Sequence, residues 1–263
     1  MALSTMMRMA FVSLVLSTGT TSACAEVAPG QSCPPDFSCF LVEPRDGACP
    51  HPAVVLDEAS KSTKYDGDRF SRAYEKACIA KTSSAVIRRD LRLRLKFGNG
   101  SSRTYKDTHN QAQCEQHQDS CILYVLYDYF PEHGLFLVHV GYNENQQWLL
   151  LNQLDGSERE IIAPPGYSPG KRWLASVYAT DGGDDGNNGV DIFPANPRAI
   201  EPEFHYRPND YEMWVFVGWD GDSRLLLKVT SWVDKELVTA PAEVVLANGK
   251  WQLNRSAPAS ARP

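Results

Sequence analysis

Apolar and polar residues alternate along the chain from about residue 86 onwards. In the segment 91–97, three leucines and a phenylalanine are separated by two arginines and a lysine. A period of two is typical of a strand that buries one face and turns its charged face to water. Aromatic and branched aliphatic runs follow at 121–129, 135–140, 148–151, 215–217, 225–229 and 244–246. The pattern therefore predicts a succession of strands.

Four turn signals join these runs into hairpins. They are Asn99-Gly100, Asp155-Gly156, Asp220-Gly221 and Asn248-Gly249. Such dipeptides supply the positive φ of a tight turn between neighbouring antiparallel strands. We expect an all-β, mainly antiparallel fold, built either as an incomplete β-propeller-like domain or as a β-sandwich.

One segment carries a more specific pattern. The run YSPGKRWLA, Tyr167–Ala175, resembles the SPDG blade signature of TolB-type and related bacterial β-propeller proteins, and residues 153–157 resemble the turn just upstream of it. The usual aspartate is missing, because Pro169 is followed directly by Gly170. The turn glycines are 56, 65 and 28 residues apart, so they show no uniform blade period. The resemblance covers one blade and implies a binding scaffold without chemistry of its own.

The region before the strands has a different composition. Residues 26–85 are rich in cysteine and proline and predict an N-terminal arm with one helix at 69–80. Five apolar positions of that helix share one face at helical spacing: Phe70, Ala73, Tyr74, Ala77 and Cys78. The β-rich domain is expected to span 86–255, followed by a flexible tail at 256–263.

The N-terminus has the features of an export signal in their usual order. Arg8 precedes a short apolar run, and small residues follow up to Ala23-Cys24-Ala25, which fits an A-x-A cleavage site. We expect residues 1–25 to be a signal peptide and the protein to be periplasmic or secreted. Alternatively, Cys24 is the lipid-bearing cysteine of an outer-membrane lipoprotein. No apolar run is long enough for an ordinary membrane span.

Export changes how the cysteines are interpreted. Without Cys24 six remain, and an even number in an exported chain predicts three disulfides. Their pairing is open. The shortest loops are closed by Cys33–Cys39 and Cys114–Cys121, which leaves Cys49 for Cys78.

The chain is acidic, with a formal net charge of −6, and loss of Arg8 with the signal would make it −7. This balance argues against a nucleic-acid coat and against a binder of anionic membranes, because both need a basic face. It favours a basic protein partner, which an acidic surface attracts over a long range.

Catalytic motifs are weak in this sequence. Residues 166–170 match the G-x-S-x-G nucleophile elbow, but Pro169 follows Ser168 and has no N–H to donate to an oxyanion. We therefore expect a turn at Ser168 and no catalytic serine. Four tryptophans could line a sugar-binding cleft, although at strand spacing they fit the core better: Trp214, Trp219, Trp232 and Trp251.

The segment 181–191 combines carboxylates and amides with four glycines. Calcium takes six to eight oxygen ligands from a loop that can wrap around it. The candidate calcium ligands are Asp181, Asp184, Asp185 and Asp191. The alternative is a solvated loop, since loops commonly use these residue types. No other cofactor is expected.

These features together predict an exported, non-catalytic binding protein. We favour an inhibitor or immunity type that acts on a basic cell-wall-degrading enzyme. It would be similar in kind to periplasmic lysozyme inhibitors, although the Ser-Gly-x-x-Tyr motif of some of them is absent. The predicted partner contacts are Asp184, Asp185, Asp210, Tyr211 and Glu212. The alternatives are a glycan-acting hydrolase that uses Asp or Glu, and a glycan-binding envelope module.

Overall fold

The computed structural model describes residues 47–49, 67–108, 121–142, 145–178, 188–196, 200–208, 212–233 and 236–255. All of them belong to one compact unit, Glu43–Pro263. The helix α2 (Gly67–Ile79) precedes the strands, and its part of the predicted arm therefore belongs to the same unit as the β-rich part.

The described strands form four antiparallel sheets, each made of consecutive strands. The first sheet contains β1 (Val86–Arg89), β2 (Arg92–Lys96) and β3 (Ser102–Lys106). The second contains β4 (Ile122–Phe130), β5 (Leu135–Tyr142), β6 (Asn145–Asn152) and β7 (Glu158–Ile161). The third contains β8 (Gly166–Tyr167), β9 (Trp173–Tyr178), β10 (Gly189–Pro194) and β11 (Phe204–Tyr206). The fourth contains β12 (Glu212–Trp219), β13 (Arg224–Val233), β14 (Glu236–Ala247) and β15 (Lys250–Arg255).

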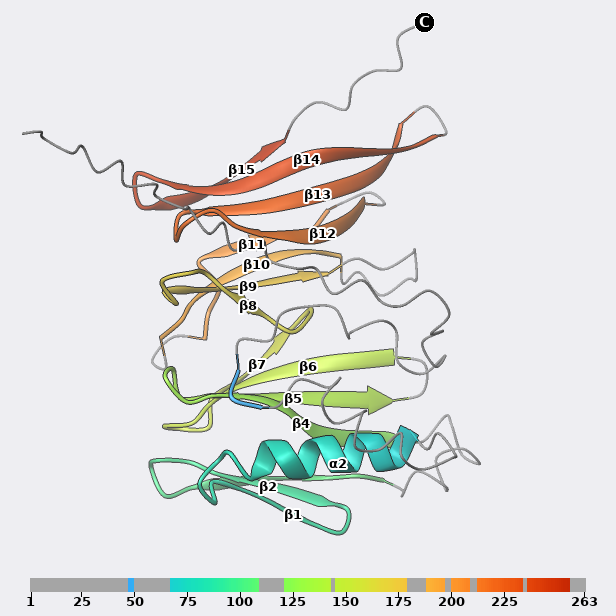
Figure 1. Cartoon of the computed structure of the whole chain (residues 1–263), viewed down its shortest axis with the longest axis vertical. Coiled ribbons are helices and arrows are strands. Elements are labelled where there is room, and N and C mark those ends of the chain that lie inside the picture. The colour runs from blue at the N-terminus through green and yellow to red at the C-terminus, as the bar shows by residue number, and fades with distance from the viewer. Residues whose placement is uncertain are drawn as a thin grey trace, which may run out of the picture. The chain divides into compact units, whose positions relative to one another are not determined.

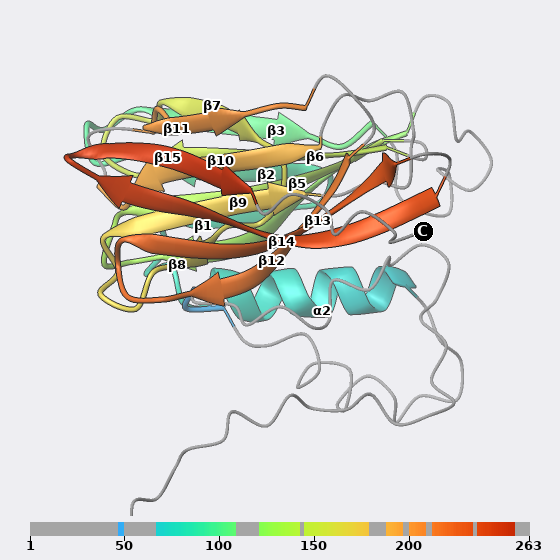
Figure 2. The same ribbon diagram turned by 90° about the horizontal axis from the view of Figure 1, so that it is seen from above.

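This order confirms the all-β, mainly antiparallel prediction and favours its propeller-like alternative. Each sheet is an up-and-down meander, and the sheets follow one another in chain order (Figure 1). A sandwich would instead distribute the strands over two sheets with Greek-key crossings. Seen from above, the strands of the sheets lie over one another and α2 lies along one side (Figure 2).

The three four-stranded meanders follow a period that the turn glycines do not show, although β1 begins only 36 residues before β4. Strands β4, β8 and β12 begin at residues 122, 166 and 212, which gives spacings of 44 and 46 residues. The turn glycines do not reveal this period because they follow strands at different places within their sheets. They come after β2, the second strand of the first sheet, after β6, the third strand of the second, and after β12 and β14, the first and third strands of the fourth. The four predicted hairpin turns themselves are confirmed, and each of their glycines has a positive φ.

Alternation along the strands determines how the sheets pack. In β2, Leu93 and Leu95 are buried, and Arg92, Arg94 and Lys96 on either side of them are exposed. The third and fourth sheets share one core, to which Trp173, Ile192 and Trp214 belong. Strands β9 and β10 are buried almost throughout, because sheets cover both of their faces.

Helix α2 begins two residues before its predicted start and ends one residue before its predicted end. Tyr74 and Cys78 are buried as expected, but Ala73 is exposed and Glu75 is buried. The predicted apolar face was therefore wrong at Ala73. The side chain of Phe70 lies outside the described residues.

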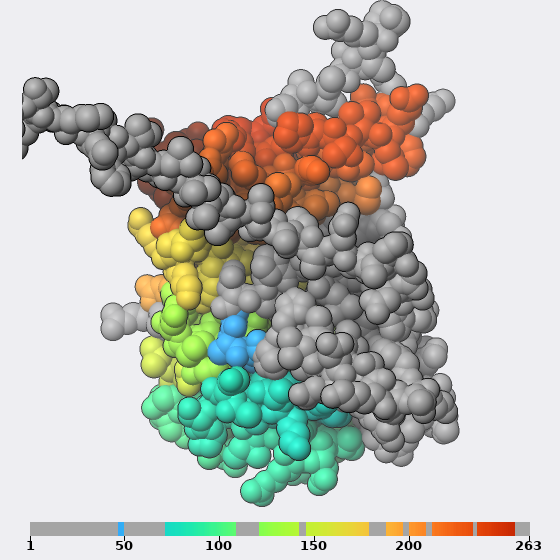
Figure 3. Space-filling model, viewed as in Figure 1, coloured from blue at the N-terminus to red at the C-terminus, as the bar shows by residue number. Residues whose placement is uncertain are grey.

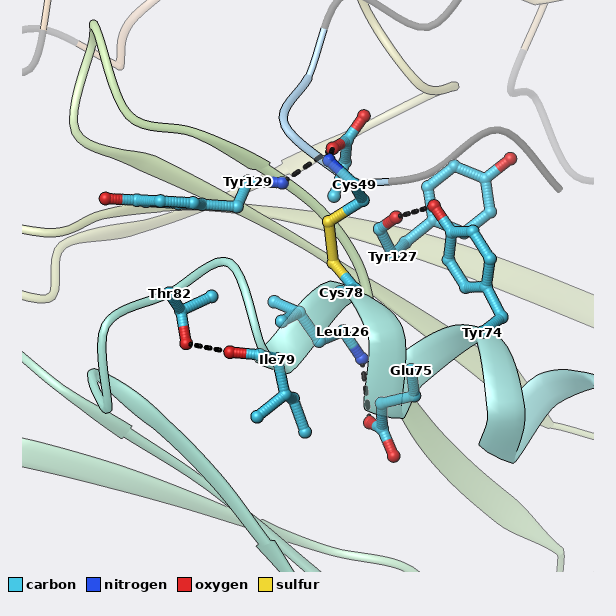
Figure 4. The surroundings of a disulfide bond; sticks show 10 residues. Cys49, Tyr74, Glu75, Cys78, Ile79, Thr82, Leu126, Tyr127 and Tyr129 are labelled. Carbon is cyan, nitrogen blue, oxygen red and sulfur yellow. Dashed lines mark hydrogen bonds between the residues drawn. A yellow bond between two sulfur atoms is a disulfide. The ribbon is translucent and has the colours of Figure 1, made fainter. Parts of the chain in front are cut away.

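A disulfide joins Cys49 to Cys78 near the end of α2, with the two Cα atoms 4.5 Å apart (Figure 4). The Cys49 N–H donates to Oδ1 of Asp128 at 3.3 Å, and the Ala48 N–H donates to the Tyr129 carbonyl at 2.7 Å. The disulfide links residues 47–49 to α2, and the two hydrogen bonds link the same residues to β4.

The structure confirms this pairing, which the sequence reached only by leaving Cys49 and Cys78 over. Cys121 is also disulfide-bonded. Cys33, Cys39 and Cys114 lie outside the described residues, so the other two predicted pairs remain predictions.

The double substitution Cys49→Ala/Cys78→Ala is expected to lower the free energy of unfolding. The bridge spans 29 residues, and confining a loop of that length in the unfolded chain is worth about 3–4 kcal/mol. Urea unfolding followed by circular dichroism measures the change. A midpoint equal to that of the wild type would contradict this account of the bridge.

Candidate functional site

The two most deeply buried carboxylates of the described residues belong to a four-residue ionic cluster between α2, the first sheet and β4. Glu75 and Asp107 are 1% and 0% exposed. Arg88 donates to Glu75 through Nη2 at 2.7 Å and through Nε at 2.9 Å, and to Asp107 through Nη1 at 3.0 Å. Arg72 donates to Asp107 at 2.8 Å and to Glu75 at 3.3 Å. Two cations and two carboxylates therefore balance one another.

Backbone groups complete this cluster. Oε1 of Glu75 accepts from the Leu126 N–H at 3.0 Å, and Oδ1 of Asp107 accepts from the Tyr124 N–H at 2.9 Å. Burial by itself lowers the pKa of Arg72, while the hydrogen bond to Asp107 and the charges of both carboxylates raise it more, so the net shift is upward. We interpret the cluster as structural, because each carboxylate is held by guanidinium and backbone donors and fastens α2 to β4.

Arg88→Met is expected to destabilise the fold by about 3–5 kcal/mol, because it leaves two buried carboxylates with one partner in place of two. Its neighbour in sequence is the matched control. Arg89 is exposed on the other face of β1, so Arg89→Met should change stability by no more than about 0.5 kcal/mol. Urea titrations of the two variants test the difference. Equal unfolding midpoints would show that the cluster contributes little.

Ser168, the serine of the G-x-S-x-G match, lies in the turn between β8 and β9, as predicted from the proline that follows it. It is buried, and its Oγ accepts from the backbone N–H groups of Arg172 and Trp173 at 3.3 Å. The Gly170 N–H donates to Oδ1 of Asp222 at 2.7 Å, which fixes the turn to the fourth sheet. The hydroxyl therefore serves the turn.

Asp191 belongs to β10 and is buried at 2% exposure. Its two oxygens accept from Nη1 and Nη2 of Arg207 at 3.0 and 2.7 Å, and Oδ1 lies 2.8 Å from Nδ1 of His205. Its carboxylate thus has partners in β11 and in the residue that follows this strand. The other candidate calcium ligands, Asp181, Asp184 and Asp185, lie outside the described residues, so calcium binding by that loop remains a prediction.

Glu212, a predicted partner contact, is the first residue of β12, and its carboxylate is hydrogen-bonded to other residues of the protein. It accepts from Nη1 of Arg255 at 2.5 Å and from Nε1 of Trp214 at 3.2 Å, and its side chain is 12% exposed. Burial, and then the charge of Glu212, raise the pKa of Tyr206 beside it. Asp210 and Tyr211 lie outside the described residues.

The tryptophans divide into two groups. Trp214 and Trp251 are buried, and Trp219 packs against the same core, so the core interpretation holds for these three. Trp232 differs, because it is 56% exposed near the end of β13. Strand register places it directly opposite Leu237 of β14, which is 51% exposed.

These two residues belong to the outer face of the fourth sheet, the side turned away from the shared core. Val215 and Val217 of β12 are also about half exposed, at 48% and 51%. Arg224 pairs there with Glu243 at 2.6 Å. An open hollow crosses the face and is lined in part by Val217, Arg224, Leu226, Lys228, Pro241 and Glu243. We call this surface the β12–β15 outer face; the sheet lies at the molecular surface in Figure 3.

Exposed aliphatic and aromatic side chains around paired charges are the composition of a protein-binding surface. Sequence reasoning missed this face because it took 215–217 as an ordinary apolar strand. The available signal was that β12 is apolar on both sides, with Trp214 facing the core and Val215 facing outwards.

Searches of family models, of curated proteins and of solved structures found no match to this chain. Within the described ranges, no helix is long and apolar enough to cross a membrane. The same residues contain no group of three or more histidine, cysteine, aspartate or glutamate side chains placed to hold a metal.

Proposed function

We propose that this protein is an exported, non-catalytic binding protein that engages a protein partner through the β12–β15 outer face. The exposed pair Trp232 and Leu237 carries the proposal. Tryptophan is enriched among the residues that dominate binding energy at protein interfaces. An aromatic and an aliphatic side chain opposite each other would give a partner one apolar anchor point, which binding would remove from water.

The disulfides support export. The Cys49–Cys78 bond and the disulfide-bonded Cys121 are expected to persist in an oxidising compartment. A signal peptide at 1–25 would deliver the chain to the periplasm or to the exterior, and an anchor at Cys24 would hold it at the outer membrane. The resemblance of Tyr167–Ala175 to a TolB-type blade is compatible with a scaffold that binds and does not catalyse.

The partner that we propose is a basic cell-wall-degrading enzyme, which the protein would inhibit. The net charge of −6 would steer a basic enzyme towards the chain. The face spans about 27 Å from Arg224 to Trp232 and about 14 Å across its strands. The product of these two lengths is about half the area that one partner contributes to a standard interface. A stable complex would therefore also use the adjoining loops.

Trp232→Ala is expected to weaken binding of a basic lysozyme about 30-fold, as loss of an interface anchor does. Folding stability should be nearly unchanged, because the side chain is largely exposed. The matched control is Leu154→Ala, since Leu154 is 50% exposed but lies in the β6–β7 turn of the second sheet. Titration calorimetry and inhibition of cell-wall lysis measure the effect.

Three results would count against this proposal. Unchanged affinity of Trp232→Ala would remove the face from the interface. Failure of the wild-type protein to bind or inhibit the lysozyme would reject the inhibitor type. Release of soluble wall fragments by the protein alone would favour the alternative of a glycan-acting hydrolase.

The double substitution Asp184→Ala/Asp185→Ala separates the two roles proposed for the acidic loop. If the loop binds calcium, added Ca²⁺ should raise the melting temperature of the wild type by mass action, and the double variant should lose that rise. If the loop steers a basic partner, the variant should associate more slowly, and the difference should shrink as salt is added.

Glu160→Ala is the control, because Glu160 is an exposed carboxylate of β7 and is not a candidate calcium ligand. It should leave the calcium-induced rise and the rate of association with a basic partner unchanged. A double variant that matches the wild type in both measurements would show that the loop has neither role.

A further inference from the structure

The outer face of the first sheet concentrates positive charge. The segment 86–106 contains seven arginines and lysines and one acid, Asp90, which lies in the β1–β2 turn. Two of the seven, Arg88 and Arg103, pair with carboxylates on the inner side. The other five are exposed and form no ion pair within the part of the chain that the structure describes: Arg89, Arg92, Arg94, Lys96 and Lys106. We call this surface the basic face.

Strand register places these cations side by side. Arg89 of β1 is opposite Arg92 of β2, which in turn is opposite Lys106 of β3. In the next row of this face, Arg94 lies between Ile87 and Thr104, and its guanidinium donates to Ser102 at 3.1 and 3.2 Å. Three positive charges therefore form one row across all three strands.

Folding alone gives no reason for this row. Like charges directly opposite each other destabilise a sheet. Several cations elsewhere in the described chain lie beside carboxylates, as in Arg159–Glu201, Lys171–Glu132 and Arg224–Glu243. An anionic ligand would remove the repulsion, and the absence of carboxylates from the outer side of these strands leaves the charges available to it.

We propose that the basic face binds the anionic headgroups of a phospholipid surface. The face measures about 13 Å along β2 and about 10 Å across the three strands. Its side chains are long, flexible cations, and none of the large apolar residues that are exposed in the described chain belongs to it. Contact would be electrostatic, with the sheet lying against the headgroups and no side chain inserted below them.

Other anionic partners fit the face less well. Single-stranded nucleic acid needs aromatic rings for base stacking, but Tyr105 is turned inwards and stacks on Tyr124 at 4.9 Å. The major groove of duplex DNA admits a helix or a two-stranded ribbon, and this sheet has three strands. A protein interface would need a buried anchor, and Ile87 alone is a poor one.

The inference that the chain lacks a basic face did not foresee this row of cations. It rested on the net charge of −6, which is a sum over the whole chain. The alternation of arginine and lysine with leucine in β2 puts its three cations on the same side. Pairing with β1 and β3 then adds Arg89 and Lys106 to them. This proposal does not rest on the proposed inhibitor function, because it uses a different sheet.

Sedimentation with lipid vesicles tests the proposal on the purified protein. Vesicles of equal parts phosphatidylglycerol and phosphatidylcholine are compared with pure phosphatidylcholine vesicles at about 0.1 M salt, where charges act over about 10 Å. The test variant is Arg92→Gln/Arg94→Gln/Lys96→Gln. The matched control, Lys76→Gln/Arg172→Gln/Lys250→Gln, removes three exposed positive charges from other elements. Thermal melting checks that both variants fold, and the test variant should melt no lower than the wild type.

The wild type and the control should bind the anionic vesicles, while the test variant should bind about a hundredfold more weakly, since each cation is worth about a factor of five at such a surface. Pure phosphatidylcholine should bind none of the three. If the test variant melts early, release of the wild type at high salt provides the second measurement. Equal binding of both variants, equal binding to neutral vesicles, or tighter binding to duplex DNA than to anionic vesicles would overturn the proposal.

Discussion

The structure depends on the packing of one antiparallel meander against the next. A four-stranded sheet cannot be stable with both apolar faces in water, and each meander here buries a face against its neighbour in the chain. The third sheet, covered on both sides, shows the consequence most clearly, since β9 and β10 are buried almost throughout. Asp191 is tolerated in that environment because Arg207 and His205 meet its carboxylate.

Stacking of this kind leaves one face of the first sheet and one face of the last sheet without a neighbouring sheet among the described residues. The two faces expose different kinds of side chain. The last sheet exposes Trp232 and Leu237 around paired charges, which suits a protein partner. The first sheet exposes unpaired cations, which suits an anionic surface. Together the two proposals describe a protein held near a lipid surface while its fourth sheet engages another protein.

The first sheet also shows that the role of a charged residue depends on which face of the strand its side chain lies on. Arg88 and Arg89 are adjacent in sequence, but Arg88 completes a buried ionic cluster and Arg89 stands in an exposed row of cations. A β-strand directs successive side chains to opposite faces. A substitution at one position therefore tests the fold, and the same substitution at the next tests the surface.

The sequence by itself determined the local structure: the four hairpin turns, the alternating strand at 91–97, the helix near 69–80 and the turn role of Ser168. These follow from φ preferences, side-chain periodicity and the missing N–H of proline, which act within a few residues. Only the tertiary structure decided the burial of Glu75, the partners of Asp191 and Glu212, the exposure of Trp232 and the row Arg89–Arg92–Lys106. Each of these depends on which residues the sheet register and the stacking bring together from distant parts of the chain. Neither periodicity nor net charge contains that information.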